Sequence, residues 1–554
     1  MDLLIEIYSE EIPARMQRAA LTNSKDVLSK LLAEQGLTFT EIGSYIAPQR
    51  LAIFAKGLPE TTEAMTEERR GPRVNAPEAA MAGFLKSTGM TKDQLEARGD
   101  YYFAHIVSAP RPVETMLPDV LNGFLDQMPW PKSMRWHNPA TNDFTRSWIR
   151  PIRAITVMLN DKTIAFPVKG LDITAGNKTF GHRFLAPEAI QLTGLANYVE
   201  QLRTAQVIVN FDERRIVVWE SMVKAAAIKG LTIQPDETLL DEVTGLVDFP
   251  YAHLGEINAA FMHLPAEVLS TSMRVHQKYF TLLTKDGEIA PYFGVLTNVP
   301  ARTDNRLMMD GLERVLRARL SDATFFYDTD RAIPLTDLVK KLDTIVFHEK
   351  LGSVGDKVRR LESVATDATI KRAAHLCKSD LVTHMVGEFP ELQGIMGRIY
   401  ATLQGESVDV AVALEEYYQP LGPSKVTPTA PVSRALALID KMDTLVGFLG
   451  SGIKPTGSKD PLAIRRTALG IIRLIVEAKA DDVDLAEMIN KAIAAYKAQG
   501  IELSVKTIDD ILEFIQLRFQ VYMRDRCPRE KADEILGENV RIADMWNINC
   551  RSQV

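Results

Sequence analysis

The fold of the second half of this chain is decided by the stretch Leu438–Arg473, LIDKMDTLVGFLGSGIKPTGSKDPLAIRRTALGIIR. In its first part, Ile439, Leu445 and Phe448 lie close to a helical spacing. In its last part, apolar residues cover too much of the circumference for a surface helix, which indicates burial. A loop rich in glycine separates the two parts. The stretch therefore predicts two helices joined by an irregular turn, with the second helix buried.

The second of these helices is expected to begin at Asp460 and Pro461. An aspartate carboxylate accepts hydrogen bonds from the free amides of a first turn, and a proline ring presets φ at the first helical position. The same helix is expected to present Arg466 and Arg473 on one side, with Arg465 beside them.

The glycine-rich loop also invites comparison with a phosphate-binding P-loop. Segment 452–459, GIKPTGSK, has the four-residue gap of that motif between its glycines, but it ends in Ser-Lys instead of Lys-Ser or Lys-Thr. It also follows a predicted helix, whereas the nucleotide-binding motif follows a strand. A turn between helices is therefore favoured over a nucleotide site.

Length and composition exclude several classes of protein. A chain of 554 residues is too long for one core, and two to four domains are expected. No apolar run reaches the ~18 residues that span a bilayer, and the N-terminus lacks a signal segment, so no membrane contact is expected. Only Cys377, Cys527 and Cys550 are present, without CxxC spacing, which argues against structural zinc or disulfides and favours the reducing cytoplasm.

The charge balance does not by itself indicate a nucleic-acid-binding protein. The formal net charge is −7 at pH 7. Phosphate contacts require nearby Lys and Arg side chains and not a basic total. An RNA partner would therefore have to be bound by local basic patches on an acidic body.

The character of the sequence changes along the chain. Alternating and β-rich segments mix with helical ones up to about residue 300, and Asp286-Gly287 is the strongest hairpin signal. Beyond that point one helical segment follows another. The fold class is predicted as multidomain α+β, with a mixed α/β N-terminal half before helical regions. The expected domains are residues 1–300, 301–480 and 481–554.

The most RNA-like stretch is residues 128–153, MPWPKSMRWHNPATNDFTRSWIRPIR. Guanidinium groups bind phosphate oxygens and indole rings stack on unpaired bases, so this mixture suits single-stranded or terminal RNA. Alternatively, the tryptophans anchor a core and the arginines pair with carboxylates. The candidate contacts are Lys132, Arg135, Trp136, Arg146, Trp148, Arg150 and Arg153.

Two further basic groups are weaker candidates. Arg274 and Lys278 fall in the block LPAEVLSTSMRVHQKYF (264–280), which suits either an RNA or subunit contact or a packed junction between helix and strand. The glycine-rich loop and the helix after it carry a second group, which contacts a phosphate backbone or is simply solvated. That group consists of Lys454, Lys459, Arg465 and Arg466.

Signatures of amino-acid activation are missing from the sequence. The GLER segment at 311–314 superficially resembles an ATP-gripping motif of class II synthetases, but the strand with spaced glycines that should precede it is absent. An exposed amphipathic helix is the better interpretation. HIGH and KMSKS signatures are also absent, so no catalytic residue is assigned.

Several blocks of the sequence resemble one family when taken together. The words DKMDTLVGF, KPTGSKDP and AIRRTALGIIR resemble the beta subunit of the bacterial two-subunit glycyl-tRNA synthetase. So do LLIEIYSEEIPAR (3–15), GHRF (181–184), EVTGLVDFP (242–250) and EFPELQGIMG (388–397). The blocks occur in family order and span most of residues 1 to about 525.

The resemblance implies a function and a partner. In this family the beta chain binds tRNA for glycine and presents its acceptor end to a separate alpha chain, usually in an alpha2beta2 assembly. The alpha chain carries the ATP site, with Mg²⁺, and forms glycyl-adenylate. The resemblance therefore implies a tRNA-binding ligase subunit that binds no cofactor itself. The alternative is a free-standing RNA-binding protein descended from the family.

The helical region also resembles an HD-type metallohydrolase domain, whose metal ligands are a His, a His-Asp doublet and a later Asp. His348 and Asp440 match the first and last positions, but Ser379-Asp380 has serine where the doublet requires histidine. A site without that imidazole loses a ligand and the geometry that orients a bridging water. No bound metal is therefore expected, and an HD-type phosphohydrolase is the less favoured alternative.

The C-terminal region is expected to depart from the family. The family's anticodon-binding domain should be entered near FIQLRFQVYMRD (514–525), and residues 481–554 are interpreted as its truncated helical start. The final segment MWNINCRSQV does not resemble family sequence, so anticodon recognition by this chain is in doubt.

Overall fold

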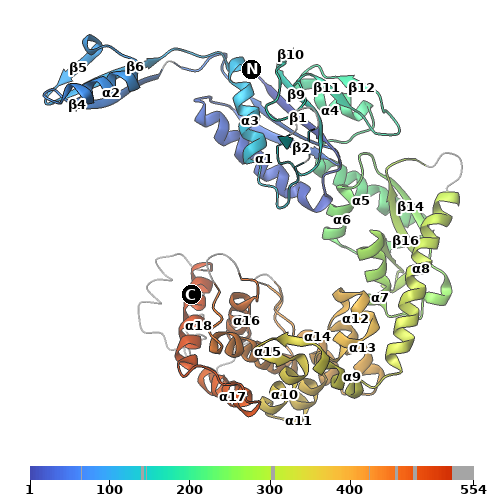
Figure 1. Cartoon of the computed structure of the whole chain (residues 1–554). Coiled ribbons are helices and arrows are strands. Elements are labelled where there is room, and N and C mark those ends of the chain that lie inside the picture. The colour runs from blue at the N-terminus through green and yellow to red at the C-terminus, as the bar shows by residue number, and fades with distance from the viewer. Residues whose placement is uncertain are drawn as a thin grey trace. The chain divides into compact units, whose positions relative to one another are not determined.

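The chain folds into two compact units, which are coloured along the sequence in Figure 1. The first comprises Met1–Glu256 and Gln277–Glu313, and the second comprises Ile257–His276 and the chain from Arg314 onward. The computed structural model describes residues 1–63, 65–135, 137–138, 143–144, 146–300, 306–422, 425–455, 460–477 and 483–526. Strands and helices mix in the first unit and helices dominate the second, which confirms the coarse fold class. The three-part division by role stays a prediction.

A five-stranded antiparallel sheet organises the first unit, in the order β10-β9-β1-β3-β2. The central strand β1 pairs with β3 on one side and with β9 on the other. The strands are β1 (Leu3–Ser9), β2 (Glu41–Ala47), β3 (Arg50–Lys56), β9 (Ile152–Leu159) and β10 (Lys162–Thr163).

Strand β1 is buried along its whole length because both faces of the sheet are covered. Its alternate residues point to opposite faces. Leu3, Ile5 and Ile7 join the core beneath α1 (Ala14–Glu34) and α3 (Leu117–Gln127). Leu4 joins a second core beneath α4 (Leu195–Thr204). The mainly apolar run LLIEI, which Glu6 interrupts, therefore follows from a strand with two buried faces.

A four-stranded sheet in the order β13-β15-β16-β14 forms a second layer of the first unit. Helix α5 packs on it through Val218 and Met222. The Asp286-Gly287 hairpin is confirmed, because β15 and β16 meet there and Gly287 has a φ of 83°. The elements are α5 (Phe211–Ile228), β13 (Thr232–Ile233), α6 (Glu237–Thr244), β14 (Tyr251–Glu256), β15 (Phe280–Leu283) and β16 (Ile289–Thr297).

Smaller elements complete the first unit. A three-stranded sheet in the order β4-β6-β5 accompanies helix α2, and two pairs of short strands follow later in the chain. These elements are β4 (Met65–Arg73), α2 (Glu78–Thr88), β5 (Leu95–Arg98), β6 (Tyr101–Ser108), β7 (His137–Asn138), β8 (Asp143–Phe144), β11 (Lys178–Phe180) and β12 (Ala189–Gln191).

The second unit is built around α15, which contacts α10, α11, α14, α16, α17 and α18. Helix α8 continues across the boundary between the two units. The elements are α7 (Ala266–Thr271), α8 (Arg306–Arg331), α9 (Leu335–Lys341), β17 (Val346–His348), β18 (Gly352–Ser353), α10 (Val354–Val364), α11 (Ala368–Leu376), α12 (His384–Glu388), α13 (Ile395–Leu403), α14 (Val408–Glu416), α15 (Pro431–Gly450), α16 (Ile464–Val476), α17 (Leu485–Ala498) and α18 (Thr507–Arg524).

The two helices predicted from the opening stretch are α15 and α16, but the start of α16 was predicted wrongly. The helix begins at Ile464 and not at Pro461. Asp460 nevertheless caps it, because its carboxylate accepts hydrogen bonds from the amides of Ile464 and Arg465 at 2.8 and 2.9 Å. Ala463 turns through a left-handed conformation with φ 57°, which lets a carboxylate four residues away reach the first turn.

Burial of α16 is confirmed, with a correction for one arginine. Ile464, Ile472 and Val476 are almost fully buried. Arg473 does not emerge from the surface, since it is only 6% exposed and donates to the Gly422 carbonyl and the Glu477 carboxylate. The buried face of the helix therefore includes an arginine whose guanidinium donors find acceptors within the protein.

Gly447 marks a close approach of α17 to α15. A Cβ built at this position would overlap the buried Tyr496 hydroxyl of α17. We expect Gly447→Ala to lower the stability of the helical unit by about 1–3 kcal/mol, because inserted carbon displaces packed neighbours. Thermal unfolding followed by circular dichroism measures the change.

Gly311→Ala in α8 is the matched control, since a Cβ at that position meets nothing within 4 Å. This variant should gain about 0.5–1 kcal/mol from helix propensity. Equal melting temperatures for the two variants would contradict close packing at Gly447.

Candidate nucleic-acid interface

Two of the three tryptophans of segment 128–153 anchor the core of the first unit. Trp148 is 1% exposed, and the Trp130 ring packs edge-on against it at a centroid distance of 5.3 Å. Phe124 of α3 lies against the same indole at 6.4 Å. Trp148 therefore has no face open to a nucleotide base, which corrects its prediction as an RNA contact. Trp136 lies outside the described residues.

Two arginines of this segment are paired with carboxylates, as the alternative interpretation required. Arg146 donates to Asn122 at 2.7 Å and to Asp126 at 2.9 Å. Arg153 donates to Glu10 at 2.9 Å. Ion pairs at the surface do not prevent RNA binding, but they reduce the free energy gained on binding. Each pair must open, or the arginine must share its guanidinium with a phosphate.

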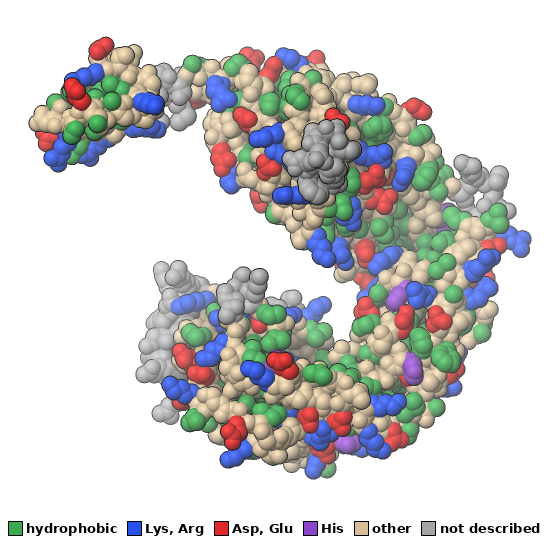
Figure 2. All heavy atoms as spheres, in the orientation of Figure 1, with side chains coloured by type: hydrophobic (Ala, Val, Ile, Leu, Met, Phe, Trp, Pro, Cys, Tyr) green, Lys and Arg blue, Asp and Glu red, His purple; other side chains and the backbone are tan. Residues whose placement is uncertain are grey.

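Lys132 and Arg135 are the more accessible cations of the segment. Both are exposed, and neither has an ion-pair partner in the part of the chain that the structure describes. Figure 2 shows basic and acidic side chains interspersed over the visible face of each unit, in keeping with the net charge of −7. Contact with RNA at Lys132 and Arg135 stays a prediction.

Arg150 lies at a hollow of about 460 Å³ that the sequence did not predict. The hollow brings together the blocks SEEIPAR, GHRF and EVTGL, which are far apart in the sequence. Glu10 faces Arg153 and Glu11 faces Arg183 here. Its lining is Glu10, Glu11, Ile12, Pro13, Ala14, Pro48, Arg150, Arg183, Gly245 and Leu246.

The block 264–280 is a helix followed by an irregular turn. Ser272–Gln277 form a π-helical turn after α7, with Arg274 exposed on it. Lys278 has φ 60° and its ammonium lies 3.0 Å from the Glu242 carboxylate. Phe280 is buried, as the packed-junction interpretation expected. The two interpretations of Arg274 and Lys278 both stay open.

The basic group around the glycine-rich loop is divided. Lys454 pairs with Asp510 of α18 at 3.1 Å, while Lys459 lies outside the described residues. Arg465 and Arg466 lie in the first turn of α16. The structure therefore describes Lys454, Arg465 and Arg466, and it shows Lys454 paired with a carboxylate.

The predicted HD metal position is filled by lysine side chains. The Asp440 carboxylate lies 3.0 Å from the Lys378 ammonium and 3.3 Å from that of Lys357. Burial alone would raise the pKa of Asp440, but Lys357, Lys378 and Lys441 outweigh it and hold that pKa well below its usual range. The carboxylate is thus charged and already neutralised by cations of the chain.

The remaining HD positions do not converge on Asp440 as ligands. Ser379 is buried and its hydroxyl has no hydrogen-bond partner among the described residues. Asp380 accepts a hydrogen bond from the Gly394 amide at 2.5 Å. The His348 ring accepts from the Lys350 amide and packs against Phe448. No cluster of three His, Cys, Asp or Glu suitable for a metal occurs in the described part of the chain.

A sequence model of one protein family extends over nearly all of these elements. The model described as "Glycyl-tRNA synthetase beta subunit" matches residues 3–536. The chain belongs to this family. Its function is accordingly that of a beta subunit of glycine–tRNA ligase.

Relatives in three bacteria agree with the family assignment, and each is named glycine–tRNA ligase beta subunit. The Paracoccus denitrificans protein is 41% identical over 95% of this chain and 77% of its own length. The values for Rhodospirillum centenum are 40%, 97% and 79%, and those for Dinoroseobacter shibae are 39%, 95% and 78%. The chain thus spans about three quarters of the length of these glycine–tRNA ligase beta subunits.

Two features of this beta-subunit chain were missed from the sequence. The first is that Lys357 and Lys378 neutralise Asp440. The sequence held one signal for it, because Lys378 directly precedes Ser379, the position where the HD motif has its histidine. The hollow at Arg150 had no local signal, because its walls meet only in the fold. No helix in the described residues is long and apolar enough to cross a membrane.

The burial of the Asp380 carboxyl can be tested through the pH dependence of the protein's stability. Burial raises the pKa of its carboxyl to about 6, whereas the ordinary value is 3.8. The folded chain therefore keeps this proton after the unfolded chain has lost it, so its contribution to stability disappears as pH rises from about 4 through 6. We expect Asp380→Asn to gain up to about 3 kcal/mol relative to wild type across that window.

Urea unfolding of the helical unit at pH 4.5 and at pH 7 measures this difference. Asp322→Asn, at an exposed position in α8, is the control and should shift equally at both pH values. A constant difference between Asp380→Asn and wild type would show that the carboxyl is ionised throughout.

Proposed function

We propose that this chain holds tRNA for glycine and presents it to the active site of a separate alpha subunit. That subunit would convert ATP, glycine and tRNA to glycyl-tRNA, AMP and diphosphate. The family match over residues 3–536 is the observation that carries this proposal. Holding a reacting end in the correct geometry lowers a barrier by several kcal/mol, so a chain without an activation site still contributes to the rate.

The assembly follows from the same proposal. Two alpha and two beta chains would form the enzyme in the cytoplasm, with ATP and Mg²⁺ bound by alpha and no cofactor held by this chain. Lys132 and Arg135 are our leading RNA contacts in the first unit, because they are exposed and unpaired within the described residues.

We further infer that the helical unit is an HD-like scaffold in which lysines replace the metal. Lys357 and Lys378 supply positive charge beside Asp440, where a divalent ion would otherwise sit. The residues do not fit a metal, since Ser379 stands where an imidazole is required and the Asp440 carboxylate is already paired with two lysines. This arrangement disfavours the phosphohydrolase alternative and supports a structural or RNA-docking role.

Reconstitution tests the proposed division of labour. The chain mixed with a family alpha subunit should transfer glycine to tRNA, while either protein alone should charge it poorly. Aminoacylation with labelled glycine measures the transfer. Activation of glycine by this chain alone, seen as pyrophosphate exchange, would contradict the proposal.

Reversal of charge at Lys132 and Arg135 tests the RNA contact in the first unit. The double variant Lys132→Glu/Arg135→Glu should weaken tRNA binding and lower the salt slope of log K by about 1.4–1.8, which corresponds to two lost phosphate contacts. Fluorescence anisotropy with labelled tRNA at several salt concentrations measures both quantities.

Lys224→Glu/Lys285→Glu changes the charge of the first unit equally at two other exposed positions. This control should bind nearly as wild type does. If the two double variants lose affinity equally, net charge and not a specific contact is responsible.

A further inference from the structure

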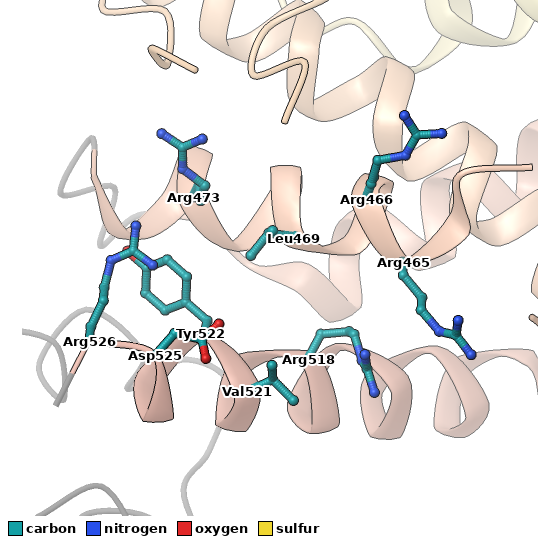
Figure 3. Close-up of a pocket in the computed structure, with 9 residues that line it drawn as sticks. All are labelled: Arg465, Arg466, Leu469, Arg473, Arg518, Val521, Tyr522, Asp525 and Arg526. Carbon is teal, nitrogen blue, oxygen red and sulfur yellow. The ribbon is translucent and has the colours of Figure 1, made fainter. Parts of the chain in front are cut away.

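The hollow at Arg150 in the first unit combines cations, carboxylates and apolar side chains in one concave site of about 460 Å³. Its composition differs from that of the groove between α16 and α18, where Figure 3 shows five arginines among nine lining residues. In that groove Arg473 is held by Glu477, and Arg526 lies over the Tyr522 ring. Small-molecule sites have volumes of about 300–1,000 Å³. The hollow at Arg150 is therefore large enough for a small ligand that carries more than one kind of chemical group.

The floor of the hollow is fixed by hydrogen bonds and holds an unused acceptor. The Ile12 amide donates to the Pro48 carbonyl at 2.6 Å. Gln17 Nε2 donates to the carbonyls of Ile12 and Gly245 at 3.0 and 2.8 Å. Gln17 Oε1 is buried without a hydrogen-bond partner among the described residues, and a Cβ built on Gly245 would lie 3.1 Å from it. The floor therefore needs little ordering when a ligand binds.

The loop that carries Arg183 is also held in place. His182 beside it is fully buried, and its ring donates to the Asn298 carbonyl at 2.6 Å. The same ring accepts hydrogen bonds from the amides of Phe184 and Leu185 at 3.1 and 3.2 Å. The Arg183 side chain is therefore presented from a rigid turn.

The hollow contains the groups that bind a phosphate. Pro13 and Ala14, at the start of α1, line it, and this helix has neither a side-chain cap nor an acid in its first turn. The amides at a helix N-terminus bind anions and phosphates. Arg150 is half-buried, donates to the Ile149 carbonyl, and has no carboxylate partner in the described part of the chain. An anion in the hollow would therefore meet an available guanidinium and the positive end of a helix.

The two carboxylates of the hollow do not cancel its cations. Glu10 is engaged by Arg153, which donates to it at 2.9 Å. Glu11 lies 4.0 Å from Arg183, at the outer limit of an ion pair, and both side chains are more than half exposed. Three arginines, with Arg150, therefore accompany two carboxylates. A net positive charge remains for an anion, and Glu11 remains available as an acceptor.

A 5′-ribonucleotide matches this set of groups. Guanidinium groups present paired N–H donors to two oxygens of a phosphate. Carboxylates accept hydrogen bonds from ribose hydroxyls, as an acidic residue does in dinucleotide-binding folds. Pro13 and Leu246 offer an apolar surface to a base, since Leu246 is 50% exposed. An amino acid would leave that surface uncovered, and inorganic phosphate would leave Glu11 without a donor.

We propose that the hollow at Arg150 binds a free 5′-ribonucleotide, with Arg150, Arg183 and the N-terminus of α1 on its phosphate and Glu11 on its ribose. This site goes beyond the proposed function as a tRNA holder and does not depend on it. A terminal phosphate carries about two negative charges at pH 7, whereas a phosphate within an RNA chain carries about one. The gathering of two arginines and a helix N-terminus therefore favours a free mononucleotide over an RNA chain.

Isothermal titration calorimetry of the full chain with adenosine 5′-monophosphate (AMP), without tRNA or alpha subunit, tests the phosphate contact. Arg150→Gln/Arg183→Gln should weaken AMP binding about tenfold or more, because charge-assisted hydrogen bonds to the phosphate are lost. Since Arg150 is half-buried, Arg183→Gln is measured alone as well and should give a smaller loss. Thermal unfolding followed by circular dichroism checks that each variant is folded.

Arg111→Gln is the matched control for the phosphate contact. Arg111 is an exposed arginine of the same unit and does not line the hollow. This variant should bind AMP as the wild-type chain does.

The ribose contact is tested by comparing AMP with 2′-deoxy-AMP in the same titration. The wild-type chain should bind AMP about three- to tenfold more tightly, because the deoxy compound lacks a donor to the carboxylate. Glu11→Ala should lose this preference. Glu220→Ala, at an exposed position on α5, is the control and should keep it.

Three outcomes separate this site from the proposed function. Absence of AMP binding by the wild-type chain would overturn the assignment, and so would equal affinity in a natively folded Arg150→Gln/Arg183→Gln. Displacement of AMP by tRNA would show that the end of an RNA occupies the hollow, which overturns the choice of a free nucleotide. A chain that binds AMP but no tRNA would support the site and overturn the proposed function instead.

Discussion

The helical unit depends on a carboxylate, that of Asp443, which is 3% exposed and is held by three side chains from two other helices. Arg360 and Lys357 of α10 donate to it at 2.7 and 3.0 Å, and Tyr496 of α17 donates at 3.2 Å. A buried ion pair adds little net stability over an apolar contact, but removing one partner is costly because the other charge stays buried. The network therefore specifies how α10, α15 and α17 meet more than how strongly they adhere.

The same network explains why the centre of this unit is unsuited to metal chemistry. Lys357 of α10 contacts both Asp443 and Asp440, and Lys378, just after the end of α11, contacts Asp440 as well. Lys441 turns away to the carbonyls of Tyr417, Tyr418 and Gln419, and burial lowers its pKa to about 8. The Asp440 and Asp443 carboxylates are thus both paired with cations of the protein.

Local rules predicted much of the fold. The Asp286-Gly287 hairpin and the change to a mainly helical chain beyond about residue 300 both appear where their patterns placed them. Local rules failed where a distant partner decided the outcome. The spacing of Arg466 and Arg473 indicated a common exposed side, yet Glu477 and the Gly422 carbonyl draw Arg473 into the core. Trp148 had the residue type of a base-stacking site but fills the core beside Phe124.

The sequence by itself determined the family, the change from mixed α/β to mainly helical structure, and the incomplete set of HD ligands. Each of these depends only on residue identity and short-range spacing. Only the tertiary structure decided which charges are neutralised. Lys357 meets Asp443 across 86 residues, and Arg360 of α10 meets Tyr496 of α17 across 136 residues. Electrostatic compensation depends on distances of a few ångströms between side chains, and no periodicity in the sequence encodes those distances.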